Sequence, residues 1–256
     1  GLSGEMTRTE LVTDSPEARR MMEMLRHYGN ERETENAGIL LAKIKGLVTT
    51  EIQCNKQALM RKEINLLRVR EEITGEEYYA QMRIALELTL PFEAFLQEGE
   101  KYLTYEEQAC IQNMMQEMDR DSSEFQICMK RFEEMYRPVA EGELLGTVNG
   151  ICGLIMGYVT SELGNCGEFD RADWYSDILI KEELRSRRLA SLANCLYDRW
   201  WNHMERKRNG IFTGRKLDGE EELIKCILLS NLGRRILYES FYLKILKGKK
   251  SDIMEV

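Results

Sequence analysis

The sequence predicts an all-α protein, an α-solenoid of about five antiparallel helical hairpins wound into a right-handed superhelix. Three observations lead to this prediction. Only three prolines interrupt 256 residues, and 14 methionines and a 31% charged fraction are typical of helical chains. No segment alternates apolar and polar residues for long enough to indicate a strand. Helical hairpins that cannot bury both faces alone stack on their neighbours, whereas a bundle of unrelated helices is the alternative.

The first half of the expected array has helices whose ends are marked by capping or breaking residues. Ser15 caps the first helix, and Pro16 suits its first turn. Gly46 ends the second helix, Gly75 separates the third from the fourth, and Pro91 closes the fourth. The expected helices are 15–28, 31–46, 50–72 and 74–88.

The rest of the chain continues the pattern with longer helices. Residues 92–102 are interpreted as a connector. Thr104 and Glu107 have the spacing of a capping box, and Asp121 or Ser122 caps the helix after it. The expected helices here are 104–118, 122–137, 141–163, 168–184, 186–208 and 218–246.

The hairpin around Gly167 defines the expected repeat. Gly167 supplies a left-handed turn, Phe169 packs between the two helices, and Ala172 is small enough to let them approach closely. This order is typical of a tetratricopeptide-like hairpin. Gly75 and Ala80 repeat the spacing, but not at a multiple of the usual repeat length, so the units are unequal. The expected boundaries are a disordered or tag-derived segment at 1–14, the repeat domain at 15–247 and a flexible tail at 248–256.

Charge and hydropathy exclude several classes of protein. A formal net charge of −8 argues against a chain that grips a phosphate backbone. No run of 18 apolar residues and no basic-then-apolar N-terminal segment is present, so we expect neither a membrane span nor a signal peptide, and a cytoplasmic location. The seven cysteines stand singly, without metal-binding spacing, and are interpreted as buried thiols of a reducing cytosol.

No catalytic, metal or cofactor motif is recognised, so the chain is not expected to be an enzyme. His27 and His203 stand in no Ser, Cys or carboxylate motif and are interpreted as structural. Basic residues near 185–216 are interpreted as a solvated face, with an anion-contacting surface as the alternative. Four glycines spaced by three or four residues favour close helix packing, with a ligand groove as the alternative: Gly146, Gly150, Gly153 and Gly157.

Two stretches carry a resemblance to a known family. They read ITGEEYYAQMRIALELTLP followed by LTYEEQACIQNM, and ELGNCGEFDRADWYSDILIKEELRSRRLASLANCLYDRWWNHMERKRNG. Together they resemble the C-terminal tetratricopeptide-like region of XRE-type helix-turn-helix transcriptional regulators from Firmicutes. The DNA-binding domain of that family is absent, and 67–80 only faintly echoes a helix-turn-helix. The resemblance implies a region that dimerises and binds a short signalling peptide in its concave groove.

The leading hypothesis is therefore a sensor and dimerisation domain of a transcriptional regulator, reaching DNA only through a domain that this chain lacks. A homodimer is expected because the last helix carries more apolar surface than one side needs, at Leu228, Leu232, Ile236 and Tyr238. A protein–protein interaction adaptor is the second hypothesis, and a hydrolase or transferase the third. The candidate inward-facing ligand-binding residues are Ser161, Asn165, Asn194, Asp198, Arg199, Asn231 and Arg234.

Overall fold

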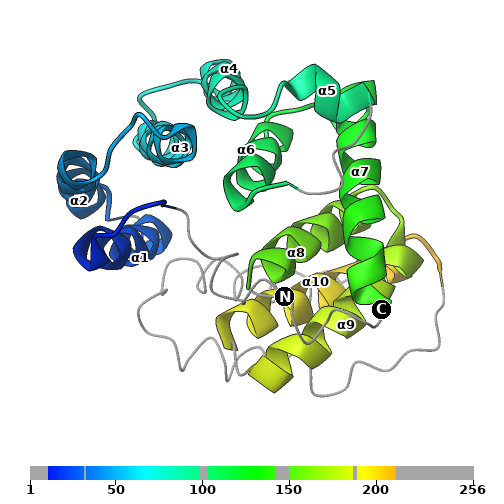
Figure 1. Ribbon diagram of the computed structural model, residues 1–256. Helices are drawn as coiled ribbons and strands as arrows, with labels where there is room; N and C mark the ends of the chain where they lie inside the picture. Colours follow the sequence, from blue (N-terminus) through cyan, green and yellow to red (C-terminus); the bar gives the residue numbers. More distant parts are fainter. Residues whose placement is uncertain (1–10, 32, 98–102, 142–149, 187–188, 212–256) are drawn as a thin grey trace. The chain divides into compact units, whose positions relative to one another are not determined.

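The computed structural model describes residues 11–31, 33–97, 103–141, 150–186 and 189–211 (Figure 1). These residues contain ten α-helices and no strand, which confirms the all-α class. The chain divides into two compact units, Gly1–Ile155 and Met156–Val256. None of the described helices has both the length and the apolar character needed to cross a bilayer.

Unit 1 is built from seven helices, most of which pack on the next helix in the sequence. Each of α1, α2 and α3 packs against its successor, and α6 contacts both α3 and α4 (Figure 1). Helices α5 and α6 both contact α7. The helices are α1 (Pro16–Glu31), α2 (Thr34–Leu47), α3 (Gln53–Val69), α4 (Gly75–Leu86), α5 (Phe92–Gln97), α6 (Tyr105–Met115) and α7 (Ser123–Ala140).

The helix starts of unit 1 follow local capping chemistry. Ser15 Oγ accepts a hydrogen bond from Ala18 N at 3.1 Å, and Ser122 Oγ accepts one from Phe125 N at 3.2 Å. Thr104 begins a complete capping box at α6, as predicted. A second capping box begins at Thr74, ahead of α4. Each cap satisfies a backbone N–H that the helix itself leaves unpaired.

The expected connector at 92–102 is wrong in its first half, because residues 92–97 form helix α5. Phe92 and Phe95 are fully buried, and their ring centroids lie 6.3 Å apart. The row of aromatic rings continues to Phe132 at 6.1 Å and from there to Tyr136 at 6.3 Å. Burial of these rings against α7 stabilises a helix that is too short to be stable by local propensity alone.

The expected N-terminal tail joins the packed structure earlier than the boundary at residue 14. Leu11 is only 3% exposed and belongs to the hydrophobic core formed with α1, α2 and α3. The backbone of Val12 is hydrogen-bonded to the side chain of Asn55. Long-range contacts of this kind have no local signature in the sequence.

A non-glycine residue with positive φ ends helix α3. Glu71 has φ 60°, and Glu72 N donates to Leu67 O at 2.9 Å, while Glu71 N donates to Arg68 O at 3.1 Å. This pair of bonds is a Schellman motif, in which glycine is the favoured residue at the left-handed position. We expect Glu71→Gly to raise the free energy of unfolding by about 0.5–1 kcal/mol. Urea denaturation followed by circular dichroism measures this, and an unchanged or lower value would contradict the assignment of strain.

Unit 2 contains α9 (Phe169–Ser186) and α10 (Leu189–Arg208), which pack against each other, and most of α8 (Gly150–Asn165), which crosses the boundary between the units. The turn between α8 and α9 confirms the predicted role of Gly167. Its φ is +79°, its N–H donates to Gly164 O at 3.1 Å, and Glu168 N donates to Leu163 O at 2.9 Å. These bonds form a second Schellman motif.

The other residues of that hairpin behave partly as expected. Ala172 is fully buried, which is consistent with the predicted close approach. Phe169 is only half-buried, and the guanidinium of Arg206 on α10 lies 5.5 Å from the centre of its ring. Arg206 also pairs with Asp170 at 2.9 Å and with Asp173 at 3.1 Å. Phe169 therefore takes part in the packing of α9 on α10.

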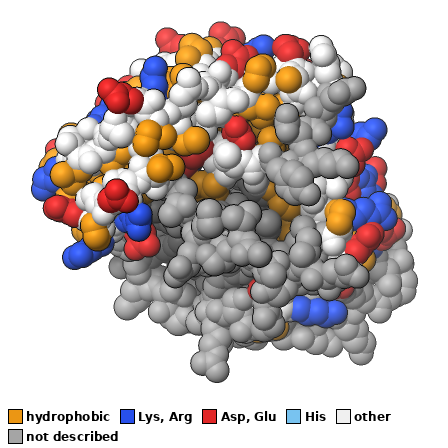
Figure 2. Space-filling model, in the orientation of Figure 1, with side chains coloured by type: hydrophobic (Ala, Val, Ile, Leu, Met, Phe, Trp, Pro, Cys, Tyr) orange, Lys and Arg blue, Asp and Glu red, His pale blue; other side chains and the backbone are white. Residues whose placement is uncertain are grey.

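The surface drawn in Figure 2 carries charged side chains of both signs, interspersed with apolar ones, over the described residues of unit 1. On this face the described surface has no extended basic patch of the kind that binds a phosphate backbone. Several large apolar side chains of unit 1 are exposed: Val12, Met24, Ile39, Leu47, Ile52, Val69 and Ile84.

Candidate functional site

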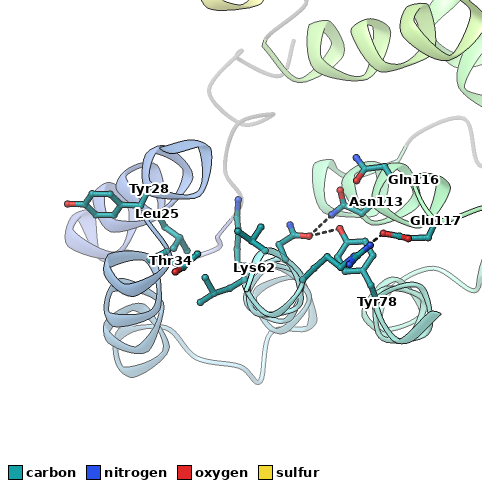
Figure 3. Close-up of a pocket in the computed structure, with 13 residues that line it drawn as sticks. Leu25, Tyr28, Thr34, Lys62, Tyr78, Asn113, Gln116 and Glu117 are labelled. Carbon is teal, nitrogen blue, oxygen red and sulfur yellow. Dashed lines mark hydrogen bonds and ion pairs between the residues drawn. The ribbon is translucent and has the colours of Figure 1, made fainter. Parts of the chain in front are cut away.

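A cavity of about 350 Å³ opens in unit 1 among α1, α2, α3, α4 and α6 (Figure 3). This volume is at the lower end of the range for small-ligand pockets. The lining residues are Leu25, Tyr28, Thr34, Ala37, Lys62, Asn65, Leu66, Arg68, Val69, Tyr78, Asn113, Gln116 and Glu117. All of them lie in a stretch of fewer than a hundred residues, in five different helices and in the turn that follows α6.

The cavity has an apolar wall on the side of α1 and α2. Leu25 and Ala37 belong to the hydrophobic core, and Tyr28 and Leu66 pack against it. Leu11 is buried in the same core. An apolar side chain of a ligand can be taken up at this wall by contact with groups that are already withdrawn from water.

The opposite wall is polar and carries two asparagines held in a hydrogen-bond network. Asn65 Oδ1 on α3 accepts from Tyr78 Oη at 2.7 Å and from Asn113 Nδ2 on α6 at 3.1 Å, and the network is drawn in Figure 3. Burial raises the pKa of Tyr78 above its ordinary value, so its hydroxyl stays a donor at neutral pH. The network therefore fixes the orientation of both amides, with the Asn65 amide N–H₂ and the Asn113 carbonyl oxygen as the remaining groups.

An ion pair borders this wall. Arg68 Nε lies 3.0 Å from Glu117 Oε1. Gly75 allows this arrangement, because a Cβ at residue 75 would come within 2.4 Å of Glu117 Oε2. Because Gly75 has no side chain, the carboxylate of Glu117 can lie close to the start of α4, where the helix dipole favours negative charge. Lys62 extends from α3 between α1 and α6 (Figure 3).

Asn55 lies two helical turns before Lys62 on α3 and is fully buried. Its Oδ1 accepts from Val12 N at 2.7 Å, and its Nδ2 donates to Val12 O at 2.9 Å and to Thr49 O at 3.1 Å. The amide therefore pairs with both the N–H and the C=O of one extended residue. Asn55 therefore recognises main chain, and the main chain that it recognises belongs to the protein itself.

Buried polar side chains hold α3 in place beneath the cavity. Gln57 Nε2 donates to Ala85 O at 3.0 Å, to Leu86 O at 3.1 Å and to Thr89 Oγ1 at 2.8 Å, which ties α3 to the end of α4. Arg61 and Glu106 form a buried ion pair between α3 and α6. Because these contacts fix α3 against two neighbours, Asn65 and Lys62 are presented from a rigid helix.

The predicted ligand-binding residues belong to unit 2, and those that the structure describes do not line this cavity. Ser161 is half-buried and Asn165 is exposed on α8, whereas Asn194 and Asp198 are half-buried on α10. Arg199 Nη1 pairs with Asp177 Oδ1 at 2.6 Å and so joins α10 to α9. Asn231 and Arg234 lie outside the described residues, as do the apolar positions expected to support a dimer. These residues stay predictions for unit 2.

Sequence reasoning missed Asn65 and Asn113, which are 48 residues apart. A signal was present, since asparagine is unfavourable inside a helix and each of these two stands within an apolar helical pattern. This signal can be interpreted only when the neighbouring helix is known, because a single asparagine in a helix is usually exposed to solvent.

The described residues contain no group of three or more His, Cys, Asp or Glu side chains that could hold a metal ion. Among the five cysteines whose side chains are described, Cys110, Cys128 and Cys195 are buried, Cys54 is half-buried and Cys166 is exposed. Burial raises the pKa of Cys110 and of Cys128 to about 12, which keeps both as unreactive thiols at neutral pH. His203 is half-buried, and the side chain of His27 lies outside the described residues.

The comparisons with known proteins are negative: no family model, no curated protein and no solved structure matches this chain. The cavity of unit 1 and its two walls are therefore the features from which a function can be inferred.

Proposed function

We propose that unit 1 is a non-catalytic, peptide-binding part of a tetratricopeptide-like α-solenoid, and that an extended peptide binds in its cavity. The observation that carries this proposal is the pairing of Asn65 with Asn113 on the polar wall. Their mutual hydrogen bond leaves the N–H₂ group of Asn65 as a donor and the carbonyl oxygen of Asn113 as an acceptor, which complement the C=O and N–H of an extended residue.

The opposite wall supports the same ligand class. Leu25, Ala37 and Leu66 offer an apolar surface across the cavity from the asparagines. An extended peptide places successive side chains on opposite sides of its main chain. The main chain of the peptide can thus form hydrogen bonds with the asparagines while one of its side chains packs on the apolar wall.

The order of packing in unit 1 supports the solenoid. Helices α1, α2 and α3 each contact their successor, and α3 also contacts α6, as the first helices of consecutive hairpins do in a repeat array. The cavity takes lining residues from α1, α3 and α6 together, as a curved inner face would.

The cellular role that we propose is that of a sensor and dimerisation domain of a transcriptional regulator, based on the resemblance to the XRE-type family. A bound peptide would change the relative orientation of the hairpins and, through a dimer, of DNA-binding domains on another part of the protein. An adaptor of the same fold would instead bind a segment of a protein partner, and would show no promoter occupancy in chromatin immunoprecipitation.

The test is capture of peptides by the purified chain. We expect the wild-type chain to retain members of a random library of short peptides, identified by mass spectrometry after gel filtration. In the double variant Asn65→Ala and Asn113→Ala, affinity for a retained peptide should fall by roughly tenfold or more, because at least two hydrogen bonds of about 0.5–1.5 kcal/mol each are lost. Isothermal titration calorimetry measures the change.

The matched control is Asn36→Ala, which removes an exposed asparagine of α2 outside the cavity. This variant should bind the same peptides as the wild type. Failure of the wild-type chain to retain any peptide, or equal affinity in the double variant and the control, would reject the proposal.

A further inference from the structure

The segment before α1 is bound to the protein in the manner of a peptide ligand. Leu11 is inserted into the core of α1, α2 and α3, and the N–H and C=O of Val12 pair with one asparagine side chain, that of Asn55. Beyond Val12, Thr13 O accepts a hydrogen bond from the guanidinium of Arg19, and Thr13 Oγ1 accepts one from Ser15 N at 3.1 Å.

The two bound residues differ in how they are recognised. The Leu11 side chain is 3% exposed, whereas that of Val12 is 57% exposed. The protein therefore selects the first residue by its apolar side chain and the second by its main chain alone. This pattern fits leucine followed by any residue that can adopt an extended backbone.

We infer that Asn55 and the core around Leu11 form a second peptide-binding subsite, specific for a Leu-X dipeptide in an extended segment, and that the chain's own Leu11–Val12 occupies it as a tethered ligand. Asn55 is nine-tenths or more buried, and all of its hydrogen-bonding groups point to this occupant or to Thr49. An external polypeptide with the same dipeptide would bind by displacing the tethered segment.

The subsite shares its core with the cavity of unit 1. Leu11, Leu25 and Ala37 are members of one hydrophobic cluster, and Tyr28 and Leu66 pack against that cluster. Exchange of the occupant therefore alters the packing behind the apolar wall of the cavity. The subsite itself does not depend on the proposed function, because none of its hydrogen bonds involves Asn65 or Asn113.

The experiment uses the full chain and a synthetic peptide with its own residues 9–14, acetyl-Thr-Glu-Leu-Val-Thr-Asp-amide. In the variant Leu11→Asp, which is designed to release the tethered segment, the peptide should bind. The wild-type chain should bind it at least tenfold more weakly, because a tethered competitor acts at an effective concentration of the order of millimolar. Binding is measured by NMR titration, which also reports the amide signals of residues around Asn55.

Three controls test which residues the binding of the peptide depends on. A peptide with Asp in place of Leu should not bind to Leu11→Asp, and adding Asn55→Ala to that variant should abolish binding of the original peptide. Adding Asn65→Ala and Asn113→Ala should leave binding intact, so that failure here and failure of the proposed function are told apart.

Leu11→Ala provides the same comparison if Leu11→Asp does not fold. Equal affinity of the peptide for the wild type and the released variant would overturn the inference. So would the absence of binding to a folded, released variant.

Discussion

Arg61→Met should lower the free energy of unfolding by about 3–5 kcal/mol, because it leaves the carboxylate of Glu106 buried without its counter-charge. The two side chains are 6% and 5% exposed, and Arg61 Nε lies 2.5 Å from Glu106 Oε2. A second bond joins Arg61 Nη2 to Glu106 Oε1 at 3.1 Å. The pair joins α3 to α6, so its loss affects the two helices that carry the cavity asparagines.

The charged form of Arg61 is stabilised by the neighbouring carboxylate of Glu106. Burial by itself lowers the pKa of Arg61, but the charge and hydrogen bond of Glu106, together with smaller contributions from Tyr105 and Cys110, raise that pKa well above its ordinary value. The guanidinium also lies 5.5 Å from the ring centre of Tyr105. The carboxylate of Glu106 is therefore the main group that stabilises the cation in this buried position.

A double-mutant cycle checks the argument. Glu106→Leu alone should also be strongly destabilising, whereas the double variant with Arg61→Met should cost far less than the sum of the single changes, because no unpaired charge remains. Urea denaturation followed by circular dichroism gives the four free energies. Additive costs would show that the pair does not act as a unit.

The exposed pair of Arg137 and Glu141 is the matched control. Its side chains are 67% and 54% exposed, and Arg137 Nε lies 2.9 Å from Glu141 Oε1. Solvent and salt screen such a pair, so Glu141→Gln should change the free energy of unfolding by less than about 1 kcal/mol. A loss as large as that of Arg61→Met would mean that burial is not the deciding factor.

Gly164→Ala should destabilise unit 2 by about 1–3 kcal/mol, the usual cost of forcing extra volume into a packed interior. A Cβ at residue 164 would lie 2.2 Å from Oδ1 and 3.0 Å from Cγ of Asn202 on α10. Asn202 is only 3% exposed, so its side chain has little room to move. Close helix packing at a glycine of α8 is thus found at Gly164, which does not belong to the predicted stripe of Gly146, Gly150, Gly153 and Gly157.

Gly157→Ala is the control on the same helix. A Cβ there would meet no atom within 4 Å, so this change should raise the free energy of unfolding by up to about 1 kcal/mol through the lower flexibility of the unfolded chain. Thermal unfolding of both variants should show changes in the free energy of unfolding that have opposite signs. In the Asn202→Ala background, which removes the clashing side chain, Gly164→Ala should lower the free energy of unfolding by less. A rise in the free energy of unfolding with Gly164→Ala alone would refute the packing argument.

The glycines of this chain illustrate what sequence patterns reveal about local structure. Gly167 was predicted from its neighbours to make a left-handed turn, and it has positive φ. Gly157, part of the predicted packing stripe, has open space around it, and Gly146 and the surroundings of Gly150 and Gly153 lie outside the described residues. A backbone conformation is decided within a few residues, whereas a close approach depends on which helix arrives from elsewhere.

The sequence by itself determined the all-α class, the capped starts of α1, α6 and α7, and the turn at Gly167, because each follows from groups close together in the chain. Only the tertiary structure decided that 92–97 is a helix, that Leu11 is core, and that Asn65 and Asn113 share a wall. These features depend on contacts between residues tens of positions apart. Helical periodicity shows that a residue faces a neighbour, but only packing shows which neighbour it faces.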